Sequence, residues 1–544
     1  MQSRKNMFRG SLLSILLVVS LTSCNKGGSE NTSDSGNGGN INDKLLDVSS
    51  IQDDLPRDGQ GNVVIDENGD IEFNDQVNLN AWCIIGDPDQ TVFNQLATKF
   101  NNEYAGRVHI NITYVGHFDY YNNLEQTYQT DFDASFPDIC IMHNEKTAQY
   151  ANKGYLYCMD TMFDKTGINF VFSQAYSNID RVSQYQGHRF AIPMDGHGFV
   201  TSIRRDIIKK NNLGFDNNTR FIPASRAEYQ ELLEKLRAKA DEGTLLVRNL
   251  IKGEDHSWKT VKGSEFYPEY YQSTDPDGLS ALYANSGSLV SSDGKTVTFQ
   301  DNKGFQTYIT DQVERYNDRL MGQFGASGAE DFPKGNDVMF SEGPWWVSQT
   351  YSLAWNSSEL TRAGEKGVSQ EDATDPVYAK PYIASRPTNW WTLEENASSE
   401  NGTKWYGNGH SMSITKHVKT WSQVAAALTF MKWYTQGKDA DSGTYHLATW
   451  CTSGHVPAWK NVYDSDEYKK ELKTNLTLKA LGDPADLITM ESLANEVTIF
   501  NGLSSAVSNV QSALKSSSGC TKEQALEIIK QAVDDVQTAL DLLG

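Results

Sequence analysis

The sequence has little of what nucleic-acid-binding, zinc-binding or membrane-spanning proteins need. Its 48 Lys and Arg face 70 Asp and Glu, for a net charge of −22. That charge repels phosphates, which argues against nucleic acid as a partner. The six cysteines form no CxxC and no Cys/His cluster at metal-site spacing, so we expect no metal site and no cofactor. Beyond the N-terminus, no stretch approaches the ~18 consecutive apolar residues of a membrane helix.

The sequence also lacks the short motifs of the common enzyme classes. It contains no GxSxG, HExxH, P-loop or Rossmann fingerprint, and no motif singles out the two carboxylates that glycoside hydrolysis requires. We therefore expect no catalytic residues and no enzyme. Two other functions stay open, namely a surface adhesin or scaffold lipoprotein and a secreted glycoside hydrolase. The 544 residues are long enough for two or more domains.

The N-terminus carries a targeting signal. Arg4, Lys5 and Arg9 precede the apolar run 12–21, which is too short to span a bilayer as a mature helix. The run ends in LTSC at Cys24, which resembles the bacterial lipobox, whose Cys becomes the lipidated first residue. We predict a lipoprotein signal peptide over 1–23 and an extracytoplasmic protein lipid-anchored to the bacterial cell membrane at Cys24. An ordinary signal peptide with an incidental Cys is the alternative, and any pairing among the other five cysteines is left open.

Residues 24–76 are predicted to be a lipid-anchored flexible tether with a small hairpin. Gly, Ser, Asn and Asp dominate 25–43, a composition typical of flexible linkers. The segment VVIDENGDIEF, residues 63–73, indicates a hairpin around Asn68-Gly69. A calcium loop is rejected there, because its glycine falls at the fourth position and the EF-hand needs it at the sixth.

From residue 77 the pattern becomes α/β. Val77 to Ile85 is a predicted strand, and Asp87-Pro88 suits the start of a helix. Residues 108–112 alternate as a strand, 120–130 fit a helix, and 138–142 form a short apolar strand. Strands and helices in this order predict a mainly parallel sheet with helices on both faces.

Several longer segments then follow in a specific order. They are AWCIIGDPDQ, FPDICIMHNEKTAQYANKGYLYCMD, YQGHRFAIPMDGHGFVTSIRRDII, DVMFSEGPWWV, HSMSITKHVKTWSQVAAALTFMKWY and SGHVPAWKNVY. From about residue 79 to the C-terminus, this order resembles the sugar-binding proteins of ABC importers, the maltodextrin-binding kind. Residues 44–76 have no counterpart in the resemblance.

The resemblance implies a two-lobed α/β fold of the periplasmic-binding-protein type. Each lobe would be a mainly parallel sheet flanked by helices, and a hinge with crossover strands near 195–203, 404–412 and 456–462 would join them. Lobe 1 would comprise 77–196 and 409–458, and lobe 2 would comprise 197–408 and 459–544. The implied function is that of a monomeric substrate-binding lipoprotein, which binds a sugar or oligosaccharide between the lobes and delivers it to the permease subunits of an ABC transporter.

The resemblance also implies ligand-binding residues at the first two turns. Asp87 would accept hydrogen bonds from sugar hydroxyls, or would simply cap a helix. Asn144, Glu145 and Lys146 form a polar turn, whose last two residues match the family's acid–base pair; a solvated turn is the alternative. Met142 stands where the maltodextrin binders have a stacking Trp, which argues against maltodextrin itself.

Later candidates come from the crossover and from aromatic residues. His197 matches an acidic ligand contact of the family, and Asp195 could supply the missing carboxylate; alternatively the two residues pair with each other. Tyr270 lies near an aromatic platform position, and Trp345 follows Gly343-Pro344 in a turn that suits a rigid ring. The other candidate aromatics, Trp390, Trp391 and Trp405, are predicted to be core residues.

Overall fold

The structure is a computed structural model that describes most of the chain after residue 42. The described ranges are 43–66, 70–87, 89–270, 275–322, 328–344, 364–386, 388–490 and 495–543. The signal peptide, Cys24, residues 25–42 and Trp345 lie outside them. In these ranges no helix combines the length and the apolar character that crossing a membrane requires. The five cysteines they contain are all buried and free of disulfides.

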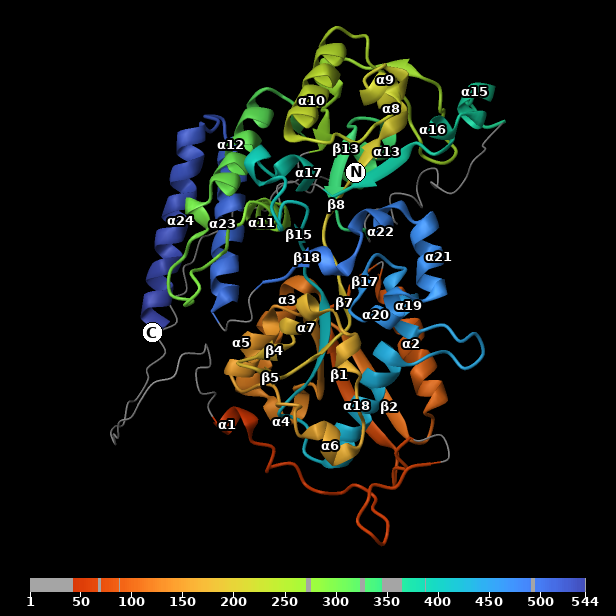
Figure 1. Ribbon diagram of the computed structural model, residues 1–544, viewed down its shortest axis with the longest axis vertical. Helices are drawn as coiled ribbons and strands as arrows, with labels where there is room; N and C mark the ends of the chain where they lie inside the picture. Colours follow the sequence, from red (N-terminus) through yellow and green to blue (C-terminus); the bar gives the residue numbers. More distant parts are fainter. Residues whose placement is uncertain are drawn as a thin grey trace, which may run out of the picture. The chain divides into compact units, whose positions relative to one another are not determined.

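The first sheet contains five strands, of which β1 and β2 are labelled in the lower part of Figure 1. In order across the sheet they are β2 (Val108–Tyr114), β1 (Val77–Cys83), β3 (Ile139–His143), β16 (His410–Ile414) and β6 (Ile192–Pro193). β1 is parallel to β2 and β3, whereas β16 is antiparallel to β3 and β6. β3 buries four apolar residues in succession, as a central strand covered on both faces does. Helix α2 (Asp89–Glu103) packs beside this sheet through Phe93, Leu96 and Phe100.

The second sheet repeats this plan with other segments. Its strands, in order, are β12 (Met321–Gly322), β11 (Glu269–Tyr270), β13 (Met339–Glu342), β8 (Val200–Arg204) and β14 (Tyr382–Ser385). β11 is parallel to β12 and β13, and β8 is antiparallel to β13 and β14. Helix α10 (Arg226–Asp241) starts at an N-cap, where the Ser225 hydroxyl accepts a hydrogen bond from the Glu228 backbone amide.

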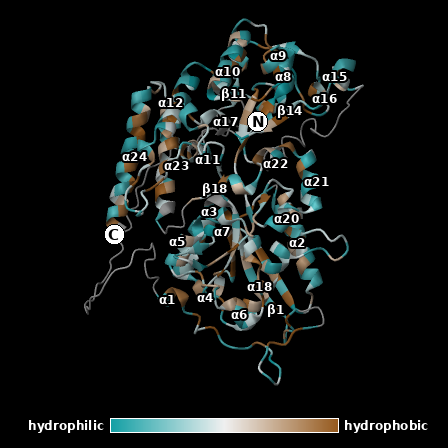
Figure 2. Ribbon diagram, viewed as in Figure 1, coloured by the Kyte–Doolittle hydropathy of each residue, from teal (hydrophilic) through white to brown (hydrophobic). Residues whose placement is uncertain are grey.

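Two long helices, α23 (Glu496–Leu514) and α24 (Lys522–Leu543), close the chain and pack on each other. α24 shows hydrophilic and hydrophobic residues interleaved along its ribbon (Figure 2). Its residues Ile529, Val533 and Leu540 recur at helical spacing and are buried in the core of the second sheet. The helix therefore contributes its apolar stripe to the second sheet's core.

Each sheet has a hydrophobic core of its own, and the predicted core aromatics divide between them. Trp405 lies in the core of the first sheet, whereas Trp390 and Trp391 lie in that of the second. The prediction of a two-lobed α/β fold is confirmed. The sheets themselves are mixed instead of mainly parallel, because β8 and β16 are entered from the opposite sheet and run antiparallel to their neighbours.

The chain passes between the two sheets through short extended segments that lie side by side. β7 (Asp195–Gly196) pairs antiparallel with β17 (Val456–Pro457), and His197 forms a bridge with Asn408. We call residues 195–197, 408–410 and 455–457 the crossing segments. After the third segment, α22 (Leu476–Leu481) packs against β8 and β14 of the second sheet. Polar side chains on the crossing segments are thus brought together from distant parts of the sequence.

The described residues 43–66 and 70–76 contribute side chains to the first sheet's core, although they were predicted to belong to the tether. Ile51, Leu55 and Ile71 are buried there, and burial of apolar surface favours the ordered state. The Gln52 amide donates to the Lys419 carbonyl at 2.8 Å. The predicted hairpin is present as an antiparallel bridge between Ile65 and Ile71. The segment predicted to be a tether therefore ends before residue 43.

Candidate functional site

The carboxyl ends of β1 and β3 carry the first group of polar side chains. Ligands of open α/β sheets bind at such ends. Asp87 follows β1 and is exposed, whereas Asp89, at the start of α2, is buried. Burial raises the pKa of Asp89 to about 7. The structure thus places a buried carboxyl group at Asp89 and a solvent-exposed one at Asp87.

The turn after β3 contains Asn144, Glu145 and Lys146. Asn144 is 1% exposed, and among the described residues neither atom of its side-chain amide has a hydrogen-bond partner. The Glu145 Oε2 atom is also buried without such a partner in the described part of the chain. Lys146 Nζ lies 4.0 Å from Glu145 Oε1 and 4.9 Å from the Tyr121 ring centroid. Burial lowers the pKa of Lys146.

Gly409 brings this turn against the crossing segments. The backbone amide of Asn144 donates a hydrogen bond to the Gly409 carbonyl oxygen at 2.8 Å. A Cβ on Gly409 would lie 2.0 Å from the Asp195 carbonyl oxygen and 2.5 Å from Asn144 Nδ2. Only glycine fits such a close approach without displacement. The polar turn and the crossing segments therefore form one continuous site.

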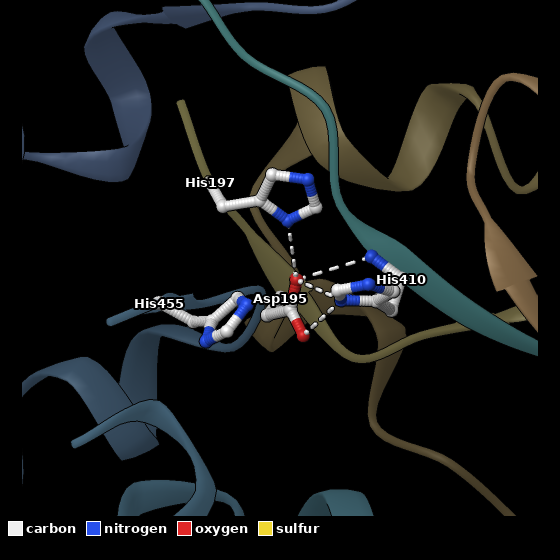
Figure 3. A group of neighbouring side chains, drawn as sticks. All are labelled: Asp195, His197, His410 and His455. Atoms are coloured by element: carbon white, nitrogen blue, oxygen red, sulfur yellow. Dashed lines mark hydrogen bonds and ion pairs between the residues drawn. The ribbon is translucent and has the colours of Figure 1, made fainter. Parts of the chain in front are cut away.

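Four buried side chains cluster on the crossing segments: Asp195, His197, His410 and His455 (Figure 3). Asp195 belongs to β7, His410 opens β16, and His455 directly precedes β17. One candidate ligand atom from each residue lies within 4.8 Å of those of the others. The ring centroids of His197 and His410 are 4.7 Å apart, and those of His410 and His455 are 5.4 Å apart. We call these four residues the histidine cluster.

Asp195 is the centre of the histidine cluster and is fully buried. It accepts hydrogen bonds from Trp450 Nε1 at 2.6 Å and from the His410 backbone amide at 3.0 Å. His410 Nδ1 lies 3.1 Å from Asp195 Oδ2, and His197 Nδ1 lies 3.5 Å from Asp195 Oδ1. The pairing of Asp195 with His197, one of two sequence alternatives, is therefore present.

The electrostatics of the cluster follow from burial and from this carboxylate. Burial alone would raise the pKa of Asp195, yet interactions with His410 and His455 hold it well below its usual range. Burial alone would lower the pKa of His410, but the Asp195 charge raises it above the ordinary histidine value. Burial lowers the pKa of His455 well below that value. The Asp195 carboxylate and burial thus shift the pKa values of His410 and His455 in opposite directions.

The remaining candidates lie elsewhere. Tyr270 sits in β11 of the second sheet, with its ring centroid 5.6 Å from that of Phe340. Burial raises the pKa of Tyr270 to about 12. Gly343-Pro344 follows β13 directly, but Trp345 is outside the described residues. Their roles in ligand binding stay predictions.

Sequence reasoning missed Asp89, His143, His410 and His455. His143 ends β3, and its ring centroid is 5.3 Å from that of His410. His410 and His455 each follow a glycine in the segments on which the resemblance rests. This Gly-His pattern was the available signal, but no spacing along the chain indicates that positions 197, 410 and 455 meet.

Comparison with known proteins supports this architecture. Residues 87–286 match the family of bacterial extracellular solute-binding proteins. The fold resembles the GacH receptor of Streptomyces glaucescens, solved unliganded and with acarbose (TM-score 0.60, 16% identity, 85% of this chain and 98% of that chain). It also resembles the sugar-binding protein MalE of Xanthomonas citri (TM-score 0.60, 13% identity, 86% of this chain and 99% of that chain). UgpB of Mycobacterium tuberculosis, in complex with glycerophosphocholine, is similar as well (TM-score 0.59, 12% identity, 86% of this chain and 99% of that chain). No curated protein matches the chain.

Proposed function

We propose that this chain is an extracellular solute-binding protein that captures a sugar or oligosaccharide for an ABC importer. The family match of residues 87–286 and the fold support this proposal. The ligand would bind between the two sheets, beside the crossing segments, and pass to the permease subunits. Anchoring through a lipid on Cys24 and a monomeric state belong to the same proposal. The role is carriage, with no chemical change in the solute.

The observation that carries the proposal is the unpartnered amide of Asn144. A buried polar group without a hydrogen bond costs roughly 1–3 kcal/mol. Asn144 lies at the carboxyl end of β3, against Gly409 of a crossing segment. The next residue, Glu145, has a buried Oε2 atom that also has no hydrogen-bond partner among the described residues. Hydroxyl groups donate and accept hydrogen bonds, so a polyol can satisfy both the amide and the carboxylate. Solved structures of similar fold were obtained with acarbose and with β-1,6-galactobiose.

A thermal-shift panel tests the proposal. The purified protein is heated with individual mono- and oligosaccharides, and one class should raise its melting temperature in a saturable manner. A ligand present at about 100 times its Kd adds roughly 2.7 kcal/mol of stability. Isothermal titration should then give one site per chain, and Asn144→Ala should weaken it while Asn101→Ala, in α2, should not.

Other outcomes would support the alternative functions. Turnover of a polymeric glycan would indicate a hydrolase, and the absence of any saturable ligand across the panel would favour an adhesin or scaffold. Release of reducing ends, measured in parallel with the melting temperature, separates these two results.

A further inference from the structure

The histidine cluster has the composition of a transition-metal site. Three imidazoles and one carboxylate are a donor set typical of zinc and related divalent ions, whereas calcium and magnesium prefer oxygen ligands. All four residues are buried, with exposed fractions from 0% for Asp195 to 8% for His197. A buried set of nitrogen and oxygen donors excludes competing water, which favours retention of a bound ion.

The spacing of the donor atoms also fits one ion. Bonds of 2.0–2.1 Å in a tetrahedral site place neighbouring ligand atoms about 3.3 Å apart. His410 Nδ1 and His197 Nδ1 lie 3.2 and 3.5 Å from Asp195 Oδ1. The four ligand atoms all lie within 4.8 Å of one another, so the widest pair needs to close by at most about 1.5 Å around an ion.

Neighbouring groups hold two of these side chains in place. Trp450 Nε1 and the His410 backbone amide donate to the Asp195 carboxylate, one to each oxygen. His455 Nδ1 lies 3.2 Å from the Ser453 hydroxyl, and its ring stacks on Trp450 with centroids 4.6 Å apart. Such outer contacts orient metal ligands and fix which ring nitrogen faces the ion. Asp89 Oδ2, 3.8 Å from His455 Nε2, places a further carboxyl group beside the cluster.

We propose that Asp195, His197, His410 and His455 bind one divalent transition-metal ion of the zinc class where the three crossing segments meet. Four protein ligands make this a closed site with a structural role. The ion ties together three segments that carry the chain between the sheets, the first of which precedes the other two by more than two hundred residues of sequence. It therefore stabilises the junction of the two lobes, beside the position proposed for the sugar.

Metal titration of the mature full-length protein tests this inference. After treatment with a chelator, the protein is titrated with Zn²⁺ alone, and we expect one equivalent to bind and the melting temperature to rise with free Zn²⁺. Co²⁺ should give the visible absorption bands of a four-coordinate site. No sugar is present in the titration, so its outcome is independent of the sugar panel.

Substitutions identify the ligands. His410→Gln and His455→Gln should each weaken Zn²⁺ binding at least 100-fold, and Trp450→Phe, which removes only an outer hydrogen bond, about 10–100-fold. His188→Gln is the control, because His188 is half-buried and pairs with Asp160 in a separate group of candidate donors. Asp195→Asn keeps the shape of the side chain, so it tests the carboxylate if a histidine variant does not fold.

The proposal is overturned if the chelated protein takes up no Zn²⁺. It is equally overturned if His410→Gln and His455→Gln keep the wild-type affinity, or if His188→Gln alone abolishes binding. Circular dichroism and melting without metal verify that each variant is folded before its affinity is compared.

Discussion

The imidazole of His446 stacks on the indole of Trp433, with ring centroids 3.7 Å apart and planes inclined by 19°. His446 begins α19 (His446–Cys451) and is 2% exposed. Its Nε2 atom is buried without a hydrogen-bond partner in the described ranges. Burial, with a smaller contribution from the Lys99 charge, lowers the pKa of His446 to about 4.

This depressed pKa predicts a specific loss of stability in mild acid. The unfolded chain binds a proton at His446 near pH 6.5, whereas the folded protein does so only near pH 4. As the pH falls through this interval, the unfolded state gains protons first and the free energy of unfolding decreases, by at most about 1.4 kcal/mol per pH unit from this group. His446→Phe keeps the stacking and should remove that contribution. Denaturant unfolding at several pH values from 7 to 4 measures this contribution. If the free energy of unfolding fell equally steeply with decreasing pH in the wild type and in His446→Phe, the prediction would be contradicted.

Gly409→Ala should damage both stability and ligand binding. The new Cβ would meet the Asp195 carbonyl oxygen at 2.0 Å and Asn144 Nδ2 at 2.5 Å, so backbone must move, at a cost of about 1–3 kcal/mol. Gly59→Ala is the matched control, because a Cβ there meets no atom within 4 Å. Chemical denaturation and sugar titration are carried out on both variants. If Gly409→Ala matched Gly59→Ala in stability and in sugar affinity, the close approach at Gly409 would be refuted.

Glu145→Gln and Lys146→Met should each weaken sugar binding. Hydrogen bonds from charged groups contribute roughly 1.5–3 kcal/mol, which corresponds to about a tenfold to hundredfold loss of affinity. Lys153→Met is the control, because Lys153 directly follows the far end of the same helix, α5 (Lys146–Asn152), and pairs with Glu125 at the surface. Titration calorimetry with the best sugar of the panel measures the effect. Unchanged affinity in both variants would exclude this turn from the binding site.

Trp345→Ala should weaken sugar binding about tenfold to a few hundredfold, because an indole platform buries the apolar face of a pyranose. Trp346 would face the other way if the strand continues, so Trp346→Ala should mainly reduce stability. The same titration and a melting curve distinguish the two variants. If Trp346→Ala alone abolished binding, the register of this prediction would be wrong by one residue.

Cys24→Ala should release the protein from the membrane or leave its signal peptide uncleaved. Lipidation occurs on the sulfur, so no other side chain replaces it. Membrane fractionation and the mass of the mature protein check this result. Unchanged membrane association and mass would show that the lipobox-like LTSC run is not used.

Local sequence signals predicted the elements better than the site. The strands predicted from residue 77, at 108–112 and at 138–142 are present as β1, β2 and β3, because alternation and apolar runs can be read within one segment. At the first turn the sequence indicated Asp87, whose role in binding stays a prediction, but it did not single out the buried carboxyl group of Asp89. A shift of two residues at a helix start changes which side chain faces inward, and composition does not record it.

The histidine cluster lies beyond such local rules. Asp195 and His197 are neighbours in sequence, and their pairing was foreseen as one of two alternatives. His410 and His455 join them only because β16 inserts beside β3 and because β17 pairs with β7. That topology comes from burial of two separate cores, which no pattern within one segment encodes. No pattern along the chain therefore predicts that these four side chains meet.

The position of β16 has a consequence for the synthesis of this protein. β16 lies between β3 and β6 in the first sheet, yet about 270 residues separate β3 from β16 along the chain. At 5–20 residues per second, a ribosome needs roughly 15–50 s to make that stretch. During this time the apolar edge of β3 has no strand to pair with, and such edges invite aggregation. The first sheet is therefore complete only after β16, its last strand in sequence, has been made.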